Sequence, residues 1–559
     1  MGIILLAVFF RFFSLTRMPG GLFPDEAANG LDINLMQAGQ LQPFYERGNG
    51  REALFFYMLW GSVELFGKGP WQHHGVSALV GVLSVIVCYA ATRRLMLVGS
   101  DASDEANKNR ATNISLLSAF LMAVSTWHVV LSRTAFRANL IPLFAGLTFY
   151  LLLKTYQDET PAKQKISAFL TGAVFALGFY SYIAYRILVP IVGILIIWPW
   201  LSSGFVYGIK RWWKQALIFI AAFVIFFAPL FNYFYTHTGS FVGRSGQVSI
   251  FNPDLHQGDL IGVAAEVTWL SVKAYFADGD LNWRHNISGF PFLSPLVSPF
   301  FGAALIAITF LAAWYIFSPR KKPGLWKYAV LAGWFWGMLL PVITTAEGIP
   351  HGLRSIGTIP PVFIITALGL YTVGEWFWQL HKKINESRPV IKNEKLMIDA
   401  PSYFRNRVIR FSMKLVVACF VAALTLQTYF AYFVYAASSA ENFYAFRSDL
   451  TPVSKYLKQR CNKDATYLAL DKFSVQTTDY ETSDWHGNFS NKCNVPYKQV
   501  DPENSWQLPR LLQGDEIIFT QSSIFDIKKF KQYHPEAQLR MEVRNKFGQA
   551  VMAVYRVNN

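Results

Sequence analysis

The chain has 559 residues, of which 53% are hydrophobic, 16% aromatic and 15% charged, and its mean hydropathy is +0.26. This composition is too apolar for an ordinary soluble domain of that length and predicts a membrane protein. The net charge of +16 lies largely in loops between apolar segments. Because no phosphate-loop motif, zinc-like Cys/His spacing or basic-aromatic segment accompanies it, we exclude nucleic-acid binding.

About eleven segments are apolar enough to cross a membrane, and each is ended by charge, Gly or Pro. We predict spans at 2–16, 74–97, 111–130, 138–156, 166–184, 186–202, 215–235, 293–317, 325–345, 356–378 and 411–437. The first span is short and is interrupted by Arg11. Two explanations stay open: Arg11 snorkels to the outer interface, or the chain lacks some upstream residues. It lacks the basic start and cleavage site of a signal peptide.

The basic residues orient these spans, because Lys and Arg concentrate in cytoplasmic loops. If the amino terminus is inside, every second loop is basic, as in the run from Lys382 to Arg410. An odd number of spans then places the first outer loop (17–73), the long outer loop (236–292) and the carboxyl-terminal tail outside. We therefore predict a multi-pass plasma-membrane protein with a transmembrane domain at 1–437.

The tail at 438–559 is polar and mixed, which predicts a small extracytoplasmic α/β domain. Its pattern predicts helices at 451–460 and 526–534, strands at 465–471 and 515–521, and a hairpin over 539–557 that turns near Gly548. Cys461 and Cys493 lie in this tail, where an oxidising compartment permits a disulfide but does not require one. The fold class is thus mostly α, with this α/β domain appended.

The first outer loop contains two predicted helices, one beginning at Pro24 and one following Arg51. Both are expected to lie in the membrane interface. Asp25 and Glu26 stand in the first turn of the former, where acidic residues favour the helix dipole. They also permit a second interpretation, because a carboxylate at an interface can accept a proton from a hydroxyl while a nearby cation holds a departing phosphate.

The order of "PDEAANGLD", "GNGREALFFYMLWGSVELFG" and "YAATRRLM" resembles the GT-C glycosyltransferases, more narrowly the protein O-mannosyltransferase and lipid A aminoarabinose transferase branch. The resemblance implies a GT-C fold and an inverting transferase that uses a polyprenyl-phosphate-linked sugar. It implies that Asp25 is catalytic, with Glu26 as its neighbour. It also implies that Arg51, followed by Glu52, stands where the aminoarabinose branch has a Glu-Lys-Pro-Pro element that binds the carrier phosphate, although the prolines are missing here.

Other outer-face residues are candidates for the same pocket. An isolated Arg at the outer end of a span contradicts the positive-inside bias, so a phosphate partner for Arg354 is weighed against interfacial snorkelling. The same choice, between binding in the pocket and a structural or headgroup role, applies to the remaining polar candidates, namely His351, Arg133, Arg137, Arg284 and His285. Asp278 and Asp280 are also consistent with a simple turn. The tyrosines at 180, 182 and 185, with Arg186, are more typical of an aromatic belt.

No metal or other cofactor is predicted to be obligatory, because only Asp25 and Glu26 are adjacent, although a divalent metal stays open. The predicted partners are a polyprenyl-phosphate-linked sugar, a protein, lipid or glycan acceptor, and membrane lipids. The main alternative is a transporter or flippase of lipid-linked sugars, which would place ionisable residues near mid-membrane and often show internal repeats. An O-antigen ligase or polymerase and a noncatalytic scaffold are further alternatives.

Overall fold

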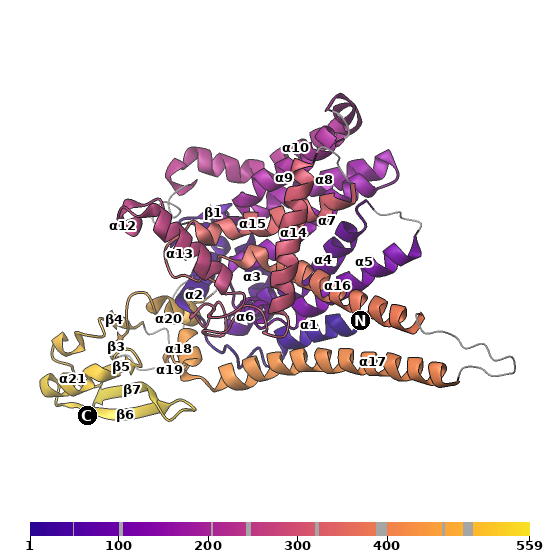
Figure 1. Cartoon of the computed structure of the whole chain (residues 1–559). Coiled ribbons are helices and arrows are strands. Elements are labelled where there is room, and N and C mark those ends of the chain that lie inside the picture. Colours follow the sequence, from indigo (N-terminus) through magenta and orange to yellow (C-terminus); the bar gives the residue numbers. More distant parts are fainter. Residues whose placement is uncertain are drawn as a thin grey trace, which may run out of the picture.

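The computed structural model describes residues 1–559 except 49, 100–103, 203–204, 242–247, 319–322, 387–399, 461–463, 485–495 and 559. A helical bundle forms most of the molecule, and a small domain with a β-sheet lies at one end of it, where helix α17 (Ala400–Tyr429) finishes (Figure 1). Cys461 and Cys493 fall outside the described residues, so their disulfide stays a prediction.

Most of the bundle consists of α-helices. They are α1 (Gly2–Phe12), α2 (Pro24–Gln37), α3 (Leu54–Phe66), α4 (Pro70–Met96), α5 (Glu105–Ala123), α6 (Thr126–Ser132), α7 (Leu140–Gln157), α8 (Pro161–Gly178), α9 (Leu188–Ser202), α10 (Phe205–Thr236), α12 (Pro253–His256), α13 (Leu260–Lys273), α14 (Ser298–Phe317), α15 (Trp326–Ile343), α16 (Ile359–Glu386) and α17. A π-helical turn, Phe430–Ala436, continues α17. Single 3₁₀ turns at Arg137–Asn139, Ile183–Ile187, Pro323–Leu325 and Ile356–Thr358 begin four of the helices.

Seven helices among the described residues are long and apolar enough to cross a membrane, which makes this a multi-pass membrane protein. They are α4, α7, α10, α14, α15, α16 and α17, and they match seven of the predicted spans. The predicted count of about eleven is not reached by these criteria. The predicted span at 111–130 is a bent pair, α5 and α6, at 62°; Val124 ends the first helix and the Ser125 side chain caps the second.

The other three predicted spans are also helical, but each fails the criteria for a crossing. α1 has 11 residues, about 16 Å of helix, and Ile183–Ile197 is likewise a short apolar helix. The predicted span at 166–184 corresponds to α8, which ends at Gly178. Apolar composition therefore identified the helices, but α1 and Ile183–Ile197 are too short for a span, and α8, which has 18 residues, is not apolar enough.

The first outer loop forms the two helices that the sequence predicts, α2 and α3. Pro24 occupies the first turn of α2, and the side chain of Glu26 accepts a hydrogen bond from the Phe23 backbone at 2.9 Å, which closes the amino end of the helix. Between the helices, strands β1 (Phe44–Tyr45) and β2 (Arg51–Glu52) pair antiparallel. This short ribbon turns the chain back and brings Arg51 beside α2.

The carboxyl-terminal domain contains a five-stranded sheet in the order β4-β3-β5-β7-β6. Its strands are β3 (Thr466–Ala469), β4 (Lys498–Val500), β5 (Glu516–Thr520), β6 (Ala537–Arg544) and β7 (Ala550–Val557), and its helices are α18 (Ala440–Ala445), α19 (Leu450–Gln459), α20 (Val475–Thr482) and α21 (Ile527–Tyr533), with 3₁₀ turns at Ser505–Gln507 and Ile524–Asp526. β3 is parallel to β4 and β5, whereas β7 is antiparallel to β5 and β6.

The predicted elements of this domain are confirmed, including the hairpin, which turns at Gly548 with a φ of +78°. The buried core lies on both faces of the sheet, where Leu468, Ile518 and Val554 pack on one side and Ile517 and Phe519 on the other. Helix α20 was not predicted. It is the element of the domain that packs against α2, as Figure 1 also shows.

Candidate active site

A cavity of about 460 Å³ lies where the two outer loops, the α15–α16 loop and the carboxyl-terminal domain meet. Seven of the residues predicted from the sequence line it, namely Asp25, Arg51, Arg137, Arg284, His285, His351 and Arg354. Two predicted residues, Glu26 and Glu52, lie behind its wall and hold lining residues in place. The structure thus brings together side chains that stand more than 300 positions apart in the chain.

Asp25 and Glu26 have separate environments although they are neighbours. Asp25 is exposed and lines the cavity, whereas Glu26 is fully buried. The Glu26 carboxylate accepts a hydrogen bond from the Ala135 backbone at 2.6 Å and lies 3.3 Å from Nε2 of His74. Burial raises the pKa of Glu26, but His74 and the backbone N–H groups outweigh it and hold that pKa below its ordinary value. Glu26 therefore fixes the start of α2 from inside the protein, and Asp25 faces outward.

Arg51 belongs to a buried network on the side of α2. Its guanidinium lies 2.9 Å from Asp32 Oδ2 and donates to Asn29 Oδ1 at 2.9 Å. Arg47, which also lines the cavity, lies 2.8 Å from the other Asp32 oxygen. Burial lowers the pKa of Arg51 to about 10, and Asp32 opposes that shift. Arg51 therefore stays protonated at neutral pH, and two cations share one carboxylate at the cavity wall.

Glu52 points away from the cavity and binds two arginines. Its Oε2 lies 3.2 Å from Arg137 Nε, and its Oε1 lies 3.5 Å from Arg186 Nη2. The Arg137 guanidinium also lies 5.2 Å from the centre of the Tyr182 ring, which lines the cavity too. Glu52 is 2% exposed and is not available to a ligand, so it holds the Arg137 side chain in position.

Arg354 reaches the cavity from the α15–α16 loop. Its Nη2 lies 3.0 Å from Glu347 Oε2, and its Nη1 donates to the Glu347 carbonyl at 2.6 Å and to Thr345 Oγ1 at 3.1 Å. Arg354 is buried, whereas the Glu347 side chain is 62% exposed. The partner of this arginine is therefore a solvated carboxylate that an anionic ligand can replace.

Arg284 lies beside the proposed base. Its guanidinium carbon stacks 3.4 Å from the centre of the Phe23 ring, and Phe23 is the residue that caps α2. Burial lowers the pKa of Arg284, and the negative charges of Asp25, Glu26 and Asp280 oppose that shift. Arg284 therefore holds a positive charge close to the start of α2, where Asp25 stands.

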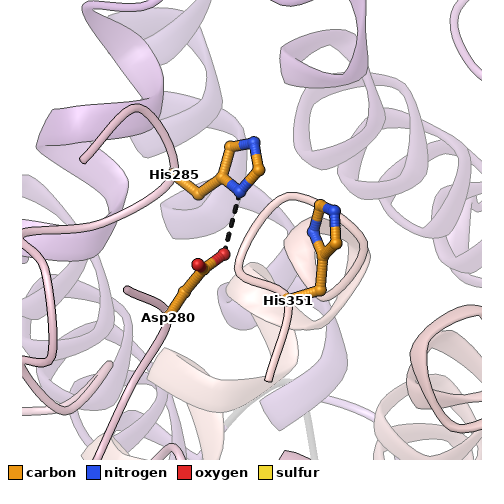
Figure 2. Close-up of side chains that lie close together, drawn as sticks. All are labelled: Asp280, His285 and His351. Carbon is orange, nitrogen blue, oxygen red and sulfur yellow. Dashed lines mark hydrogen bonds and ion pairs between the residues drawn. The ribbon is translucent and has the colours of Figure 1, made fainter. Parts of the chain in front are cut away.

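Asp280, His285 and His351 form a cluster that no spacing in the sequence indicates (Figure 2). Asp280 Oδ2 lies 2.8 Å from His285 Nδ1 and accepts the Gly352 backbone N–H at 2.7 Å, and the two imidazole rings stack 4.6 Å apart. One ligand atom from each residue lies within 4.8 Å of the others. Two nitrogens and one carboxylate oxygen are a donor set that suits a zinc-class ion, so these residues could hold one. The prediction of no obligatory metal assumed that Asp25 and Glu26 were the only potential ligands close together. This cluster shows that assumption to be wrong.

The remaining sequence candidates lie outside the cavity lining. Arg133 is fully buried and donates to the carbonyls of Phe10, Arg11, Phe13 and Met18 and to Tyr432 Oη. Tyr180 donates to the Phe226 carbonyl at 2.9 Å, and Tyr185 shares a hydrogen bond with Thr148. Asp278 is exposed and forms an ion pair with Lys273. These contacts belong to the bundle and the loops rather than to the cavity.

Several lining residues carried no sequence signal that we used. They are Asn29, Arg47, Asn282, Phe473 and Gln476. Arg47 lies four positions from Arg51 in the predicted first outer loop. A basic residue there contradicts the positive-inside bias, which singled out Arg354 and could have identified Arg47 in the same way. Phe473 and Gln476 come from the carboxyl-terminal domain, and only the docking of α20 on α2 brings them to the cavity.

No protein-family model matches the sequence, and no curated protein matches it. Solved structures do match. ArnT from Cupriavidus metallidurans bound to undecaprenyl phosphate has a TM-score of 0.54 at 14% identity, over 99% of this chain and 97% of that chain. The same protein in the apo state has a TM-score of 0.45 at 14% identity, over 99% and 96% of the two chains. The archaeal oligosaccharyltransferase AglB from Archaeoglobus fulgidus has a TM-score of 0.46 at 13% identity, over 100% and 73%.

The likeness to the first of these structures extends over nearly the whole of both chains, so it includes the carboxyl-terminal domain as well as the bundle. It agrees with the fold that the outer-loop motifs imply. The chain has the GT-C fold.

Proposed function

We propose that this protein is an integral-membrane glycosyltransferase that moves a sugar from a polyprenyl-phosphate donor to an acceptor hydroxyl on the extracytoplasmic face. The observation that carries the proposal is one cavity lined by an exposed carboxylate, Asp25, and by five arginines, at positions 47, 51, 137, 284 and 354. The similar ArnT structure has undecaprenyl phosphate bound, which is a polyprenyl phosphate. The sugar itself and the class of acceptor stay open.

In the proposed reaction the acceptor oxygen attacks the anomeric carbon of the donor. The acceptor O–H proton passes to the Asp25 carboxylate, a bond forms between the acceptor oxygen and the anomeric carbon, and the bond to the phosphate oxygen breaks. The lipid phosphate leaves with that electron pair. Because attack and departure take place on opposite faces of the carbon, the anomeric configuration inverts.

The arginines stabilise the leaving phosphate. Negative charge develops on its oxygens in the transition state, and positioned cations in a partly buried cavity stabilise it without reorganisation. The planar guanidinium groups of Arg51 and Arg354 suit bidentate contact with phosphate oxygens. A leaving group neutralised in this way needs no separate general acid. The reaction needs no obligatory metal, and an ion held by Asp280, His285 and His351 would add positive charge at the same cavity.

The alternative is a transporter or flippase of lipid-linked sugars. Against it stands the position of the ionisable cavity residues, which lie in outer loops and helix ends rather than in the middle of the seven apolar helices. A flippase needs a path for a sugar across the membrane. A transferase needs a base beside a phosphate site, and Asp25 and the arginines supply both.

The experiment uses the full chain in lipid nanodiscs with a panel of undecaprenyl-phosphate sugars and a membrane extract as the source of acceptor. We expect release of free undecaprenyl phosphate from at least one donor, and a fall of about 100-fold or more in Asp25→Asn. Asp278→Asn is the matched control, because Asp278 is an exposed carboxylate of the outer loops outside the cavity lining. Full release by folded Asp25→Asn would contradict the role of Asp25. Passage of the intact lipid-linked sugar across a vesicle membrane without release would favour the flippase.

A further inference from the structure

Helix α20 of the carboxyl-terminal domain is fixed to the helix that carries Asp25. Thr477 Oγ1 donates to the Leu22 carbonyl at 3.0 Å, just before α2 begins. Tyr480 is fully buried against α2, so closely that a Cβ added at Gly30 would lie 2.4 Å from its ring. The absence of a side chain at Gly30 therefore lets the two helices pack, and the position of α20 relative to Asp25 is set by direct contact.

Two side chains of this docked segment line the cavity. Phe473 is 48% exposed, and its ring lies edge to face with Phe23 at 5.6 Å between centres. Gln476 donates one N–H to the Phe473 carbonyl at 3.1 Å, which leaves a second N–H and the amide oxygen for other partners. An exposed aromatic face and a partly unused amide therefore stand side by side in a cavity where Arg47, Arg51, Arg137 and Arg354 have carboxylate partners.

The position of Phe473 and Gln476 relative to Asp25 indicates which substrate these two residues contact. Phe23 is two residues from Asp25, and the base must contact the acceptor hydroxyl. The carboxyl-terminal domain lies at the end of the bundle where α17 finishes (Figure 1). A polyprenyl chain, by contrast, must come from the side of the apolar helices. The segment with Phe473 and Gln476 thus contacts Phe23, two residues before Asp25, and comes from the carboxyl-terminal domain rather than from an apolar helix.

We propose that Phe473 and Gln476 form an acceptor subsite and that the acceptor group they bind is a sugar ring; this inference rests on the proposed function. The C–H face of a pyranose packs on a flat aromatic ring, and its hydroxyl groups pair with an amide that both donates and accepts. The aromatic ring aligns the acceptor sugar, and Gln476 sets which hydroxyl points at Asp25. The carboxyl-terminal domain thereby determines acceptor specificity.

The test uses the full chain in nanodiscs with the undecaprenyl-phosphate sugar that shows lipid-phosphate release. The acceptor probes are maltotriose, cellotriose and chitotriose, with a hexapeptide of Ser and Thr as a separate arm. We expect at least one trisaccharide to be glycosylated. Phe473→Ala, Phe473→Leu and Gln476→Ala should each raise the KM for that trisaccharide about fivefold or more, beyond any change in the donor KM. Phe473→Tyr keeps the flat ring and should restore the KM.

Phe525→Ala is the matched control, because Phe525 is an exposed aromatic of the same domain outside the cavity lining. The inference is overturned if no trisaccharide is glycosylated, if the peptide alone is, or if Phe473→Leu keeps the wild-type KM, since an apolar contact without a ring would then suffice. Equal changes in the donor and acceptor KM would also overturn it. Absence of lipid-phosphate release from every donor, with membrane extract present, would instead contradict the proposed function.

Discussion

Arg51 and Arg354 of the cavity are buried, as are Arg11 and Arg133 of the bundle, but the partners of the two pairs differ. Arg354 and Arg51 each pair with a carboxylate, Glu347 and Asp32 respectively, and each also donates to one backbone carbonyl. Arg133 instead donates to four backbone carbonyls and a tyrosine hydroxyl, which join the end of α1 to α6 and the turn after α17. Arg11 likewise donates to three carbonyls and contacts His128 Nδ1 at 2.7 Å.

Under the proposed function, this difference separates arginines that bind the lipid phosphate from arginines that hold helices together. Carbonyl groups of helix ends have no other partner within the bundle, so a guanidinium that satisfies several of them cannot leave without exposing them. A solvated carboxylate such as Glu347 regains water when its arginine turns to a phosphate. If the proposal holds, the partner of a buried arginine, rather than its burial, distinguishes the two roles.

The largest effect on turnover in this comparison is expected for Arg354→Gln. Loss of one preorganised cation from the leaving phosphate should lower the rate of lipid-phosphate release about 100-fold, because electrostatic stabilisation of developing charge is lost. The fold should be retained, since Gln keeps a donor for Thr345 and Glu347 is left in solvent. The measurement is the rate of release in nanodiscs, together with the apparent Tm.

The matched control for this variant is Arg544→Gln, which removes an exposed arginine paired with Glu542 in the carboxyl-terminal hairpin. Its turnover should equal that of the wild type. A folded Arg354→Gln protein with wild-type turnover would show that Arg354 only snorkels or holds its own loop, and the distinction between the two groups of arginines would not hold for this residue.

Unlike Arg354→Gln, the variant Arg133→Gln should lower the stability of the protein and leave its turnover nearly unchanged. The substitution removes most of five hydrogen bonds to a buried charge, so we expect a loss of about 2–4 kcal/mol and a clear fall in apparent Tm. Turnover per folded molecule should stay within about threefold, because Arg133 is not among the residues that line the cavity. A loss of turnover without a loss of stability would place Arg133 with the ligand-binding group.

The sequence predicted the part of the site that depends on local patterns and missed the part that depends on contacts between loops. Apolar runs located α4, α7 and α10, and the Pro24 signal located the start of α2. Asp25 and Glu26 were treated as a pair, but successive residues of a helix point about 100° apart, so one faces the cavity and the other the interior.

Contacts between distant segments account for the rest. His285 and His351 meet although α14 and α15 separate them in the chain, and no spacing rule reports such a meeting. Phe473 precedes a helix of eight residues that lacks a strong apolar period. Its place at the cavity depends on Tyr480 packing at Gly30, a fit of shapes that a single sequence does not express.

The smallest effect concerns Glu26, the buried carboxylate next to the proposed base Asp25. The folded-state pKa of Glu26 lies below its ordinary value of 4.5, so Glu26 binds protons less readily in the folded protein than in the unfolded chain. Its charge therefore stabilises the fold above that ordinary value, and this contribution is lost as pH falls through the lower, folded-state pKa. In Glu26→Gln the contribution is absent at every pH. We expect the apparent Tm of the variant to be below that of the wild type at pH 7, and the gap to narrow by pH 4. A gap that stays constant between pH 7 and pH 4 would mean that the hydrogen bonds of Glu26 to Phe23 and Ala135, rather than its charge, hold the start of α2.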